Sequence, residues 1–375
     1  MLIMKERLYL DVHVLQTVPP SCVNRDDTGS PKIAIYGGTT RSRVSSQAWK
    51  HAMREMFRDE IFDPEKLGSR TKLVLGMVEK EILELNPSAD AKKLAKKVLT
   101  NAGVKFKEDK NDKEEKKDVK ADALFFMSAA QAKALAKLAV DSVSASADEE
   151  KDLKKKCLKA LKDNPSIDIA LFGRMVASEP LLNCDAAAQV AHSISTHAVQ
   201  NEYDYFTAVD DLSPDDTAGA GHLGTVEFNS STLYRYATVN LIELAESLGK
   251  TDTPEVARGF VEAFVRSMPT GKQNTFANRT LPDAVYVTIR RDQPVNLCGA
   301  FETPVDSRDN GYAAASGRKL EEYANSVYKN FAAKPECAFA VGDLLGGLAE
   351  TMPLGELLDR VFEKTSELLS ESEGE

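Results

Sequence analysis

Long apolar runs are absent from this chain of 375 residues. Near the N-terminus, Lys5, Glu6 and Arg7 introduce charge before an apolar segment can develop, which argues against a secretory signal peptide. No later stretch is apolar over the length that a membrane-spanning helix requires. We therefore expect a cytoplasmic protein without a membrane partner.

Cysteine and histidine are scarce, with five residues of each type. The cysteines are scattered and odd in number, as is typical of free thiols in a reducing compartment, and no Cys or His group has zinc spacing. The chain has no Walker-type phosphate loop and no Gly-x-Ser-x-Gly nucleophile elbow. Gly219–Gly224 matches the dinucleotide pattern Gly-x-Gly-x-x-Gly, but an acidic loop precedes it and a β-like segment follows. We therefore expect no catalytic residue, no metal and no cofactor.

The overall composition is that of an ordinary globular protein, with 42% hydrophobic and 28% charged residues. The length is sufficient to bury a large core and to form more than one domain. The formal net charge of −10 argues against a protein coated in nucleic acid. It remains compatible with a local basic groove on an acidic body.

The most informative stretch runs from Gly37 to Arg54. It begins with a glycine turn, and Arg41 and Arg43 then alternate, so both side chains would leave one face of an extended chain. Ser45 or Ser46 can cap a following helix, whose N-terminus and basic face favour consecutive phosphates. The alternative is a solvated amphipathic helix. The polar face carries Gln47, Lys50 or His51, Arg54 and Arg58, and the apolar face carries Trp49, Met53, Met56 and Phe57.

Two adjacent carboxylates, Asp26 and Asp27, lie in a turn-forming segment before this stretch. Carboxylate oxygens are good ligands for Mg²⁺. Adjacent aspartates in a turn more often accept hydrogen bonds from backbone amides. The sequence therefore leaves two interpretations open, a hydrogen-bonded turn, which we favour, and a metal site.

Hydrophobic periodicity divides the chain into sheet-forming parts and a lysine-rich helical insertion, in which the low-complexity run 105–120 is expected to be a mobile loop. A hairpin with a long polar tip follows, formed by 205–209 and 222–228. Tyr234 and Tyr236 share one strand face, and we expect core packing for them more than base stacking. Further strands are predicted at 8–15, 32–36, 167–172, 231–241 and 284–289, and helices at 73–85, 90–99, 125–143, 148–162, 185–197, 253–268, 318–332 and 354–369.

Several separated motifs, found in one order, closely resemble the CasC family, the RNA-binding backbone subunits of the type I-E CRISPR Cascade complex. The resemblance extends from near the start of the chain to about Ile289. It is weak in the lysine-rich insertion and in the C-terminal third. The motifs are Val12–Leu15, Pro20–Asp27, Gly37–Arg54, Ile169–Met175, Phe206–Leu212, His222–Thr225 and Tyr234–Tyr236.

The resemblance implies an α+β fold with a modified RRM-like (ferredoxin-like) palm, a helical fingers insertion and a protruding thumb hairpin. It implies four kinds of partner: guide crRNA, copies of the chain in a helical filament, other Cascade subunits, and target DNA paired with the guide. The implied boundaries are 1–62 for the first part of the palm, 63–165 for the fingers, 166–200 for more of the palm, 201–226 for the thumb, and 227–375 for the rest of the palm and the C-terminal helices.

The implied function is non-catalytic: copies polymerise along the guide by sequence-independent phosphate contacts, and each thumb displaces one base. The alternative is a metal-dependent nuclease that cuts target RNA with Asp26 or Asp27. The fingers lysines predicted to bind DNA are Lys154, Lys155, Lys159 and Lys162. The basic segments and the resemblance together predict the following RNA-binding residues: Arg25, Lys32, Arg41, Arg43, Ser45, Gln47, Lys50, Arg54, Arg174, Met175, Phe206, Thr207, Leu223 and Lys272.

Overall fold

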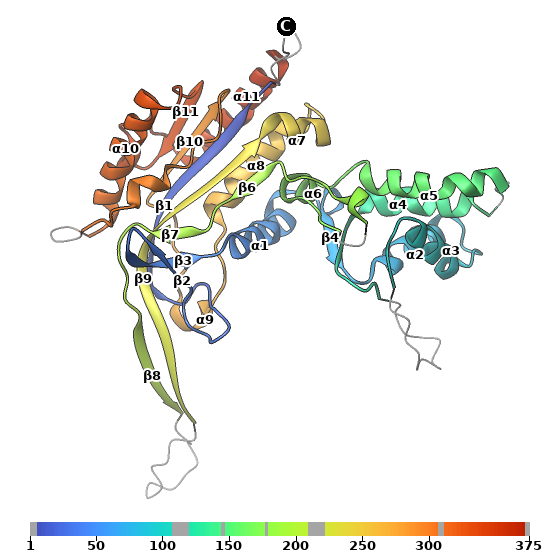
Figure 1. Cartoon of the computed structure of the whole chain (residues 1–375), viewed down its shortest axis with the longest axis horizontal. Helices are drawn as coiled ribbons and strands as arrows, with labels where there is room; N and C mark the ends of the chain where they lie inside the picture. Colours follow the sequence, from blue (N-terminus) through green and yellow to red (C-terminus); the bar gives the residue numbers. More distant parts are fainter. Residues whose placement is uncertain are drawn as a thin grey trace, which may run out of the picture. The chain divides into compact units, whose positions relative to one another are not determined.

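The computed structural model describes residues 6–106, 120–143, 147–176, 179–208, 222–306 and 311–371. Its helices and strands form an α+β fold, as expected (Figure 1). The chain divides into two units, which we call the sheet unit (residues 1–56, 190–239 and 257–375) and the helical unit (residues 57–189 and 240–256). None of the described helices is long and apolar enough to cross a membrane.

An antiparallel sheet organises the sheet unit around β1 (Tyr9–Ser21) and β10 (Ala284–Arg290). Both strands are almost entirely buried, and β10 appears in the sequence as a nearly continuous apolar run. The strands predicted at 8–15 and 284–289 are thereby confirmed. The strand order is β11-β10-β1-β9-β7-β3-β2, and β8 also pairs with β9. The remaining strands of this sheet are β2 (Ile33–Tyr36), β3 (Thr39–Val44), β6 (Ala188–Val190), which pairs with β9, β7 (Ser193–Ser195), β8 (Glu202–Ala208), β9 (His222–Asn240) and β11 (Cys337–Val341).

Helices of the sheet unit cover the buried sheet residues. On α10, Leu320 and Ala324 pack into a cluster that also contains Tyr286 and Phe301. The helices predicted at 318–332 and 354–369 are confirmed, although the first begins several residues earlier. The helices are α1 (Ser46–Met56), α9 (Gln273–Phe276), α10 (Ala313–Asn330), α11 (Leu354–Glu371) and most of α8 (Thr253–Arg266).

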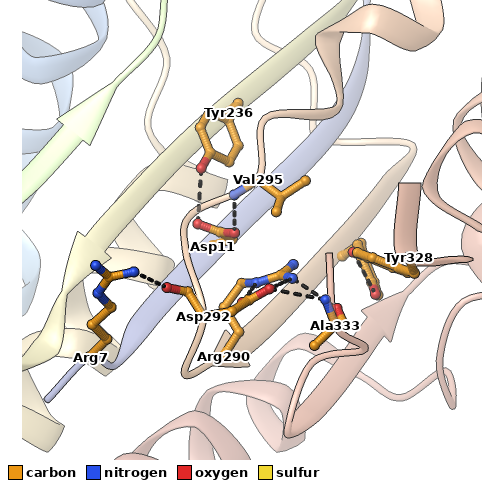
Figure 2. Close-up of polar contacts among 9 residues, drawn as sticks. Arg7, Asp11, Tyr236, Arg290, Asp292, Val295, Tyr328 and Ala333 are labelled. Carbon is orange, nitrogen blue, oxygen red and sulfur yellow. Dashed lines mark hydrogen bonds and ion pairs between the residues drawn. The ribbon is translucent and has the colours of Figure 1, made fainter. Parts of the chain in front are cut away.

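A buried carboxylate, that of Asp11, lies within this core (Figure 2). The hydroxyl of Tyr236 and the backbone amide of Val295 each donate a hydrogen bond to it at 2.9 Å. Burial raises the pKa of Asp11 to about 6, because the surrounding protein solvates the charged form poorly. The hydrogen bonds and the charge of Arg290 offset part of this effect.

Other polar side chains complete the same cluster. Tyr234 donates to or accepts from Nδ1 of His13 at 2.9 Å, and burial lowers the pKa of His13 to about 3. Arg290 forms an ion pair with Asp292 at 2.6 Å (Figure 2). Tyr234 is buried, as is Tyr236, which confirms that the two aromatic side chains belong to the core.

The helical unit contains the whole segment 63–165. Leu135 of α4 and Cys157 of α5 lie in its apolar core, and Ser128 and Gln131 form a capping box at the start of α4. The predicted mobile loop at 105–120 lies largely outside the described residues. The main elements are β4 (Gly68–Thr71), α2 (Val74–Leu85), α3 (Ala91–Asn101), β5 (Phe125–Ser128), α4 (Ala129–Asp141), α5 (Ala147–Lys162), α6 (Ile167–Phe172) and α7 (Leu241–Leu248).

Three secondary-structure predictions were wrong. The segment 167–172 is the helix α6, where the carboxylate of Asp168 accepts hydrogen bonds from Ser166 and from the Gly68 amide. The predicted helix at 185–197 contains the strands β6 (Ala188–Val190) and β7, and the helix predicted from residue 125 begins only after β5. Short apolar runs do not reveal their period, and pairing with other strands overrides local propensity.

Candidate nucleic-acid interface

The apolar face of α1 fixes this helix on the sheet unit. Ser45 caps it, since its hydroxyl accepts a hydrogen bond from the Ala48 amide at 3.3 Å. Trp49 is fully buried, and its indole N–H donates to the hydroxyl of Ser193 at 2.9 Å. Met53 and Met56 are also buried. The predicted apolar face is therefore confirmed. Ser45, a predicted RNA-binding residue, is buried, and its hydroxyl caps the helix.

The opposite side of α1 carries three polar residues, Gln47, Lys50 and Arg54, which we call the α1 ridge. Gln47 is exposed, and Lys50 and Arg54 are half-buried. Partial burial lowers the pKa of Lys50. The spacing of three and four residues aligns these side chains along the helix. A row of this kind can contact successive phosphates of one strand.

Further cations lie on neighbouring strands and loops of the sheet unit. Lys32 and Arg43 are half-buried, and Arg25 is exposed. Arg43 donates to the Ile33 carbonyl at 3.1 Å and lies 3.2 Å from Nδ1 of His192. Burial and the charges of Arg43 and Lys32 lower the pKa of His192. These charges therefore gather in one region of the unit.

An open pocket of about 570 Å³ lies next to α1. Its walls combine Arg25 and the following turn with His51 and Glu55 of the helix and with Gly271. Only glycine fits at Gly271, because a Cβ atom there would lie 2.1 Å from the Val23 carbonyl oxygen. The predicted RNA-binding residue Lys272 follows directly and is half-buried.

Arg41, a predicted RNA-binding residue, is instead part of the core. Its side chain is fully buried, and the guanidinium group donates to the carbonyl oxygens of Ser195 at 3.0 Å and Phe301 at 2.8 Å. These two acceptors belong to β7 and to the segment around Phe301, which together enclose the guanidinium group. Arg41 is thus not accessible to a phosphate, and we correct this prediction.

Arg174, in the helical unit, is corrected for the same reason. Its guanidinium group is buried and donates to the carbonyl oxygens of Leu182 and Phe126 at 3.0 and 3.1 Å. The next residue, Met175, is 86% exposed, as expected for a side chain that could wedge against a base. Gly173 permits this turn: its φ is +76°, and a Cβ atom would lie 2.9 Å from the Cys184 carbonyl oxygen.

A two-stranded arm, formed by β8 and the first part of β9, extends from the sheet (Figure 1). Every residue of β8 is exposed. Phe206 pairs with Gly224, and a Cβ atom at Gly224 would lie 2.3 Å from the phenylalanine ring, so the ring covers the glycine. Thr207 pairs with Leu223 on the opposite face. The predicted hairpin is confirmed, but the side chain of Leu223 lies outside the described part of the chain.

Two exposed aromatic residues of the arm are absent from the predicted RNA-binding set. Tyr203 and Tyr205 are 67% and 63% exposed, and they share a face with Thr207 because side chains alternate along a strand. The alternation of Tyr203, Tyr205 and Thr207 is visible in the sequence. It could have been recognised as an exposed aromatic stripe if the hairpin had been treated as solvated on both faces.

Hydrogen bonds join the base of the arm to the sheet. The Asn201 amide donates to Glu227 at 3.1 Å, and the Asn229 amide donates to Asn201 at 3.0 Å. The hydroxyl of Ser42 donates to Asn229 at 3.0 Å. Ser42 belongs to β3, which leads directly into α1. The arm and the α1 ridge are therefore built on the same rigid part of the sheet.

The predicted DNA-binding lysines lie on α5. Leu153, Cys157 and Leu161 form its buried seam. The remaining surface is strongly basic and exposed, and it includes Lys154, Lys155, Lys159 and Lys162.

The carboxylate of Asp26 is used within its own turn. One oxygen accepts hydrogen bonds from the Thr28 amide at 2.9 Å, the Thr28 hydroxyl at 2.8 Å and the Ser30 amide at 3.0 Å. The bond from the Thr28 hydroxyl is the main cause of the lowered pKa of Asp26. This arrangement agrees with the hydrogen-bonded turn. In the residues that the structure describes, no three His, Cys, Asp or Glu side chains are grouped to hold a metal ion.

Comparison with known families accounts for nearly the whole chain. The CT1975-like protein family matches residues 10–361. The chain belongs to this family. A chain of a "CRISPR RNA-guided surveillance complex, pre-nicking" is 31% identical to this CT1975-like protein, with a TM-score of 0.79 over 95% of this chain and 100% of that chain. A chain of another "CRISPR RNA-guided surveillance complex" is 27% identical, with a TM-score of 0.60 over 95% and 99%. No significant match is found among curated proteins.

The extent of the family match adds to the motif resemblance. The CasC-like motifs end near Ile289, whereas the CT1975-like match continues to residue 361. It therefore includes α10 and the first part of α11, where sequence motifs alone gave little information.

Proposed function

We propose that this CT1975-like protein is a non-catalytic backbone subunit of a type I-E CRISPR Cascade complex. It binds guide crRNA through sequence-independent phosphate contacts and presents the guide in segments for pairing with target DNA. The matches to chains of RNA-guided surveillance complexes support membership of such an assembly. The proposed setting is cytoplasmic antiviral defence, with other Cascade subunits as partners.

The observation that carries this proposal is the α1 ridge. The helix is fixed by Trp49, so Gln47, Lys50 and Arg54 lie in a row on a rigid support. Phosphate contacts of this kind set the position of a strand without reading its bases. A subunit that must accept any guide needs such contacts, since sequence information is left to base pairing.

The arm and the exposed methionine fit the same function. We assign the arm to the thumb, whose residues Phe206, Thr207 and Leu223 bracket one displaced nucleotide. Met175, in the turn that follows α6, would wedge against a base. Copies of the chain, each with an RRM-like palm, would stack in a helical filament along the guide. The lysines of α5 would face target DNA. Met175, the residues of β8 and these lysines are exposed, as this role requires.

RNA binding by the double variant Lys50→Ala/Arg54→Ala tests the proposal. Because the two residues are proposed to bind phosphates, affinity should fall alike for guides of unrelated sequence. The slope of log affinity against log salt should become shallower by about one unit for each phosphate that the variant no longer neutralises. Fluorescence anisotropy with labelled single-stranded RNA at several salt concentrations measures both quantities.

The helix α11 offers a matched control. Arg360 and Lys364 have the same four-residue spacing, and their replacement by alanine removes the same total charge from the same unit. This control variant should bind RNA as the wild type does. If the α1 variant retains wild-type affinity and salt slope, or if both variants lose affinity equally, the α1 ridge is not the phosphate-binding site.

A further inference from the structure

A third buried arginine, Arg235 of β9, lies directly behind α1. Its side chain is only 1% exposed. The guanidinium carbon lies 3.7 Å from the centroid of the Trp49 ring and 4.6 Å from that of the Phe264 ring. One terminal nitrogen donates to Oε1 of Gln16 at 2.6 Å, and the other donates to the Phe264 carbonyl oxygen. The cation is thus held between two aromatic rings.

Within the described residues, the charge of Arg235 has no acidic counterpart. Both hydrogen-bond acceptors are neutral, and Nε has no partner in the described part of the chain. Burial alone lowers the pKa of Arg235 to about 9, so the group remains a cation at neutral pH. Arg290 is also fully buried, but its charge is paired with that of Asp292. An unpaired buried cation is unfavourable for stability, so its presence calls for an explanation.

We propose that Arg235 is a positioning residue for RNA binding, which acts through α1 by placing a fixed positive charge behind the phosphate-contacting ridge. This inference rests on the proposed function. Trp49, on which the guanidinium stacks, belongs to the inner face of α1, and Lys50 and Arg54 belong to the outer side. A helix with its side chains is about 10–12 Å thick, so the charge lies about 15 Å from a phosphate on the ridge.

The protein between the two charges strengthens this effect. Little water or salt separates a buried charge from the ridge, so it is screened less than an exposed charge at the same distance. With the effective dielectric constant of a protein near its surface, the attraction at this separation changes affinity about fivefold for each phosphate. The protein carries a formal net charge of −10 and therefore repels RNA in general. A positive charge fixed behind the α1 ridge opposes this repulsion at the place where the phosphates bind.

The variant Arg235→Lys distinguishes charge from packing. A fully buried lysine has a pKa lowered by about 3–5 units, so it should lose its charge between about pH 5 and pH 7.5. The groups packed against this site, Gln16 of β1, Trp49 of α1 and Phe264 of α8, do not titrate. The affinity of the variant for labelled single-stranded RNA, divided by that of the wild type, should therefore fall about fivefold as the pH rises through this range. Titration at other sites affects both proteins and cancels in the ratio.

Two other variants complete the experiment. Arg235→Met keeps an unbranched side chain between the rings but removes the charge, so its affinity should be about fivefold low at every pH. Arg290→Lys makes the same substitution at the paired arginine, and its affinity ratio should not depend on pH. Fluorescence of Trp49, the single tryptophan, reports whether each variant keeps the packing around α1.

The outcomes separate the inference from the proposed function. A pH-dependent ratio for Arg235→Lys, with a flat ratio for Arg290→Lys, supports the inference. A flat ratio for Arg235→Lys overturns it, and this decides the matter even if Arg235→Met does not fold. If the wild type binds RNA without any contribution from Lys50 and Arg54, the proposed phosphate site fails instead.

Discussion

Replacement of Asp11 by asparagine should make the stability of the sheet unit less sensitive to pH. Burial raises the pKa of Asp11 to about 6, compared with about 3.9 in an unfolded chain. Between these values the native state binds more protons than the unfolded state, so ionisation of Asp11 destabilises the fold as the pH rises. From pH 4 to pH 7 the two pKa values give a loss of about 2 kcal/mol in the free energy of unfolding.

Urea unfolding followed by tryptophan fluorescence measures this loss. Trp49 is the single tryptophan and belongs to the same unit as Asp11, so the signal reports on the relevant core. In the asparagine variant, the changed hydrogen bonds shift the free energy of unfolding by the same amount at every pH. This shift cancels when the difference between variant and wild type at one pH is compared with the difference at another. The wild type should lose about 2 kcal/mol relative to the variant between pH 4 and pH 7.

The variant Tyr236→Phe provides an internal check. The Tyr236 hydroxyl donates to Asp11 and favours the charged carboxylate, so its removal should raise the pKa of Asp11 further. The loss of stability should then occur at higher pH than in the wild type. A difference between wild type and Asp11→Asn that does not change with pH would refute this account of the buried carboxylate.

Two further predictions concern the arm and the turn. In Gly224→Val the new side chain occupies the space of the Phe206 ring. The fluorescence of a 2-aminopurine base at the displaced guide position should therefore change, while the overall affinity for RNA stays within about threefold. An unchanged fluorescence signal would exclude a role of the ring in displacing that base. For Asp26, we expect no cleavage of complementary RNA in the presence of Mg²⁺ by the assembled complex, with or without Asp26→Ala. Cleavage that disappears in this variant would establish the nuclease instead.

The sequence predicted secondary structure and burial best in elements whose apolar residues follow one regular pattern. The apolar residues of α1 recur at helical spacing and include Trp49 and Met53, and both are buried as expected. The core strand β10 was recognised from its continuous apolar run. The hairpin of the arm followed from two strand-like segments around a polar loop. In each case local pattern and tertiary packing agree.

The sequence could not reveal which basic side chains are buried. Arg41 and Arg43 alternate on β3, but Arg41 is buried by contacts with Ser195 and Phe301, which are 154 and 260 residues away in the chain. Arg174 is similarly buried by carbonyl oxygens from separate segments of the helical unit. An arginine is usually exposed, so both were assigned to the surface. Only the tertiary structure identifies the neutral acceptors that hold them inside.

The strand β9 has one further consequence, because its 19 residues belong both to the centre of the sheet and to the arm. At about 3.3 Å per residue it spans about 60 Å without interruption, so the sheet dictates the direction and the facing of the arm. Adding one residue to each strand at the base would exchange the two faces and turn Phe206 to the side now occupied by Tyr205. Adding two would lengthen the arm by about 7 Å and preserve both faces. Arms of different length can therefore evolve on this sheet, but each strand must gain or lose two residues at a time to keep the same faces.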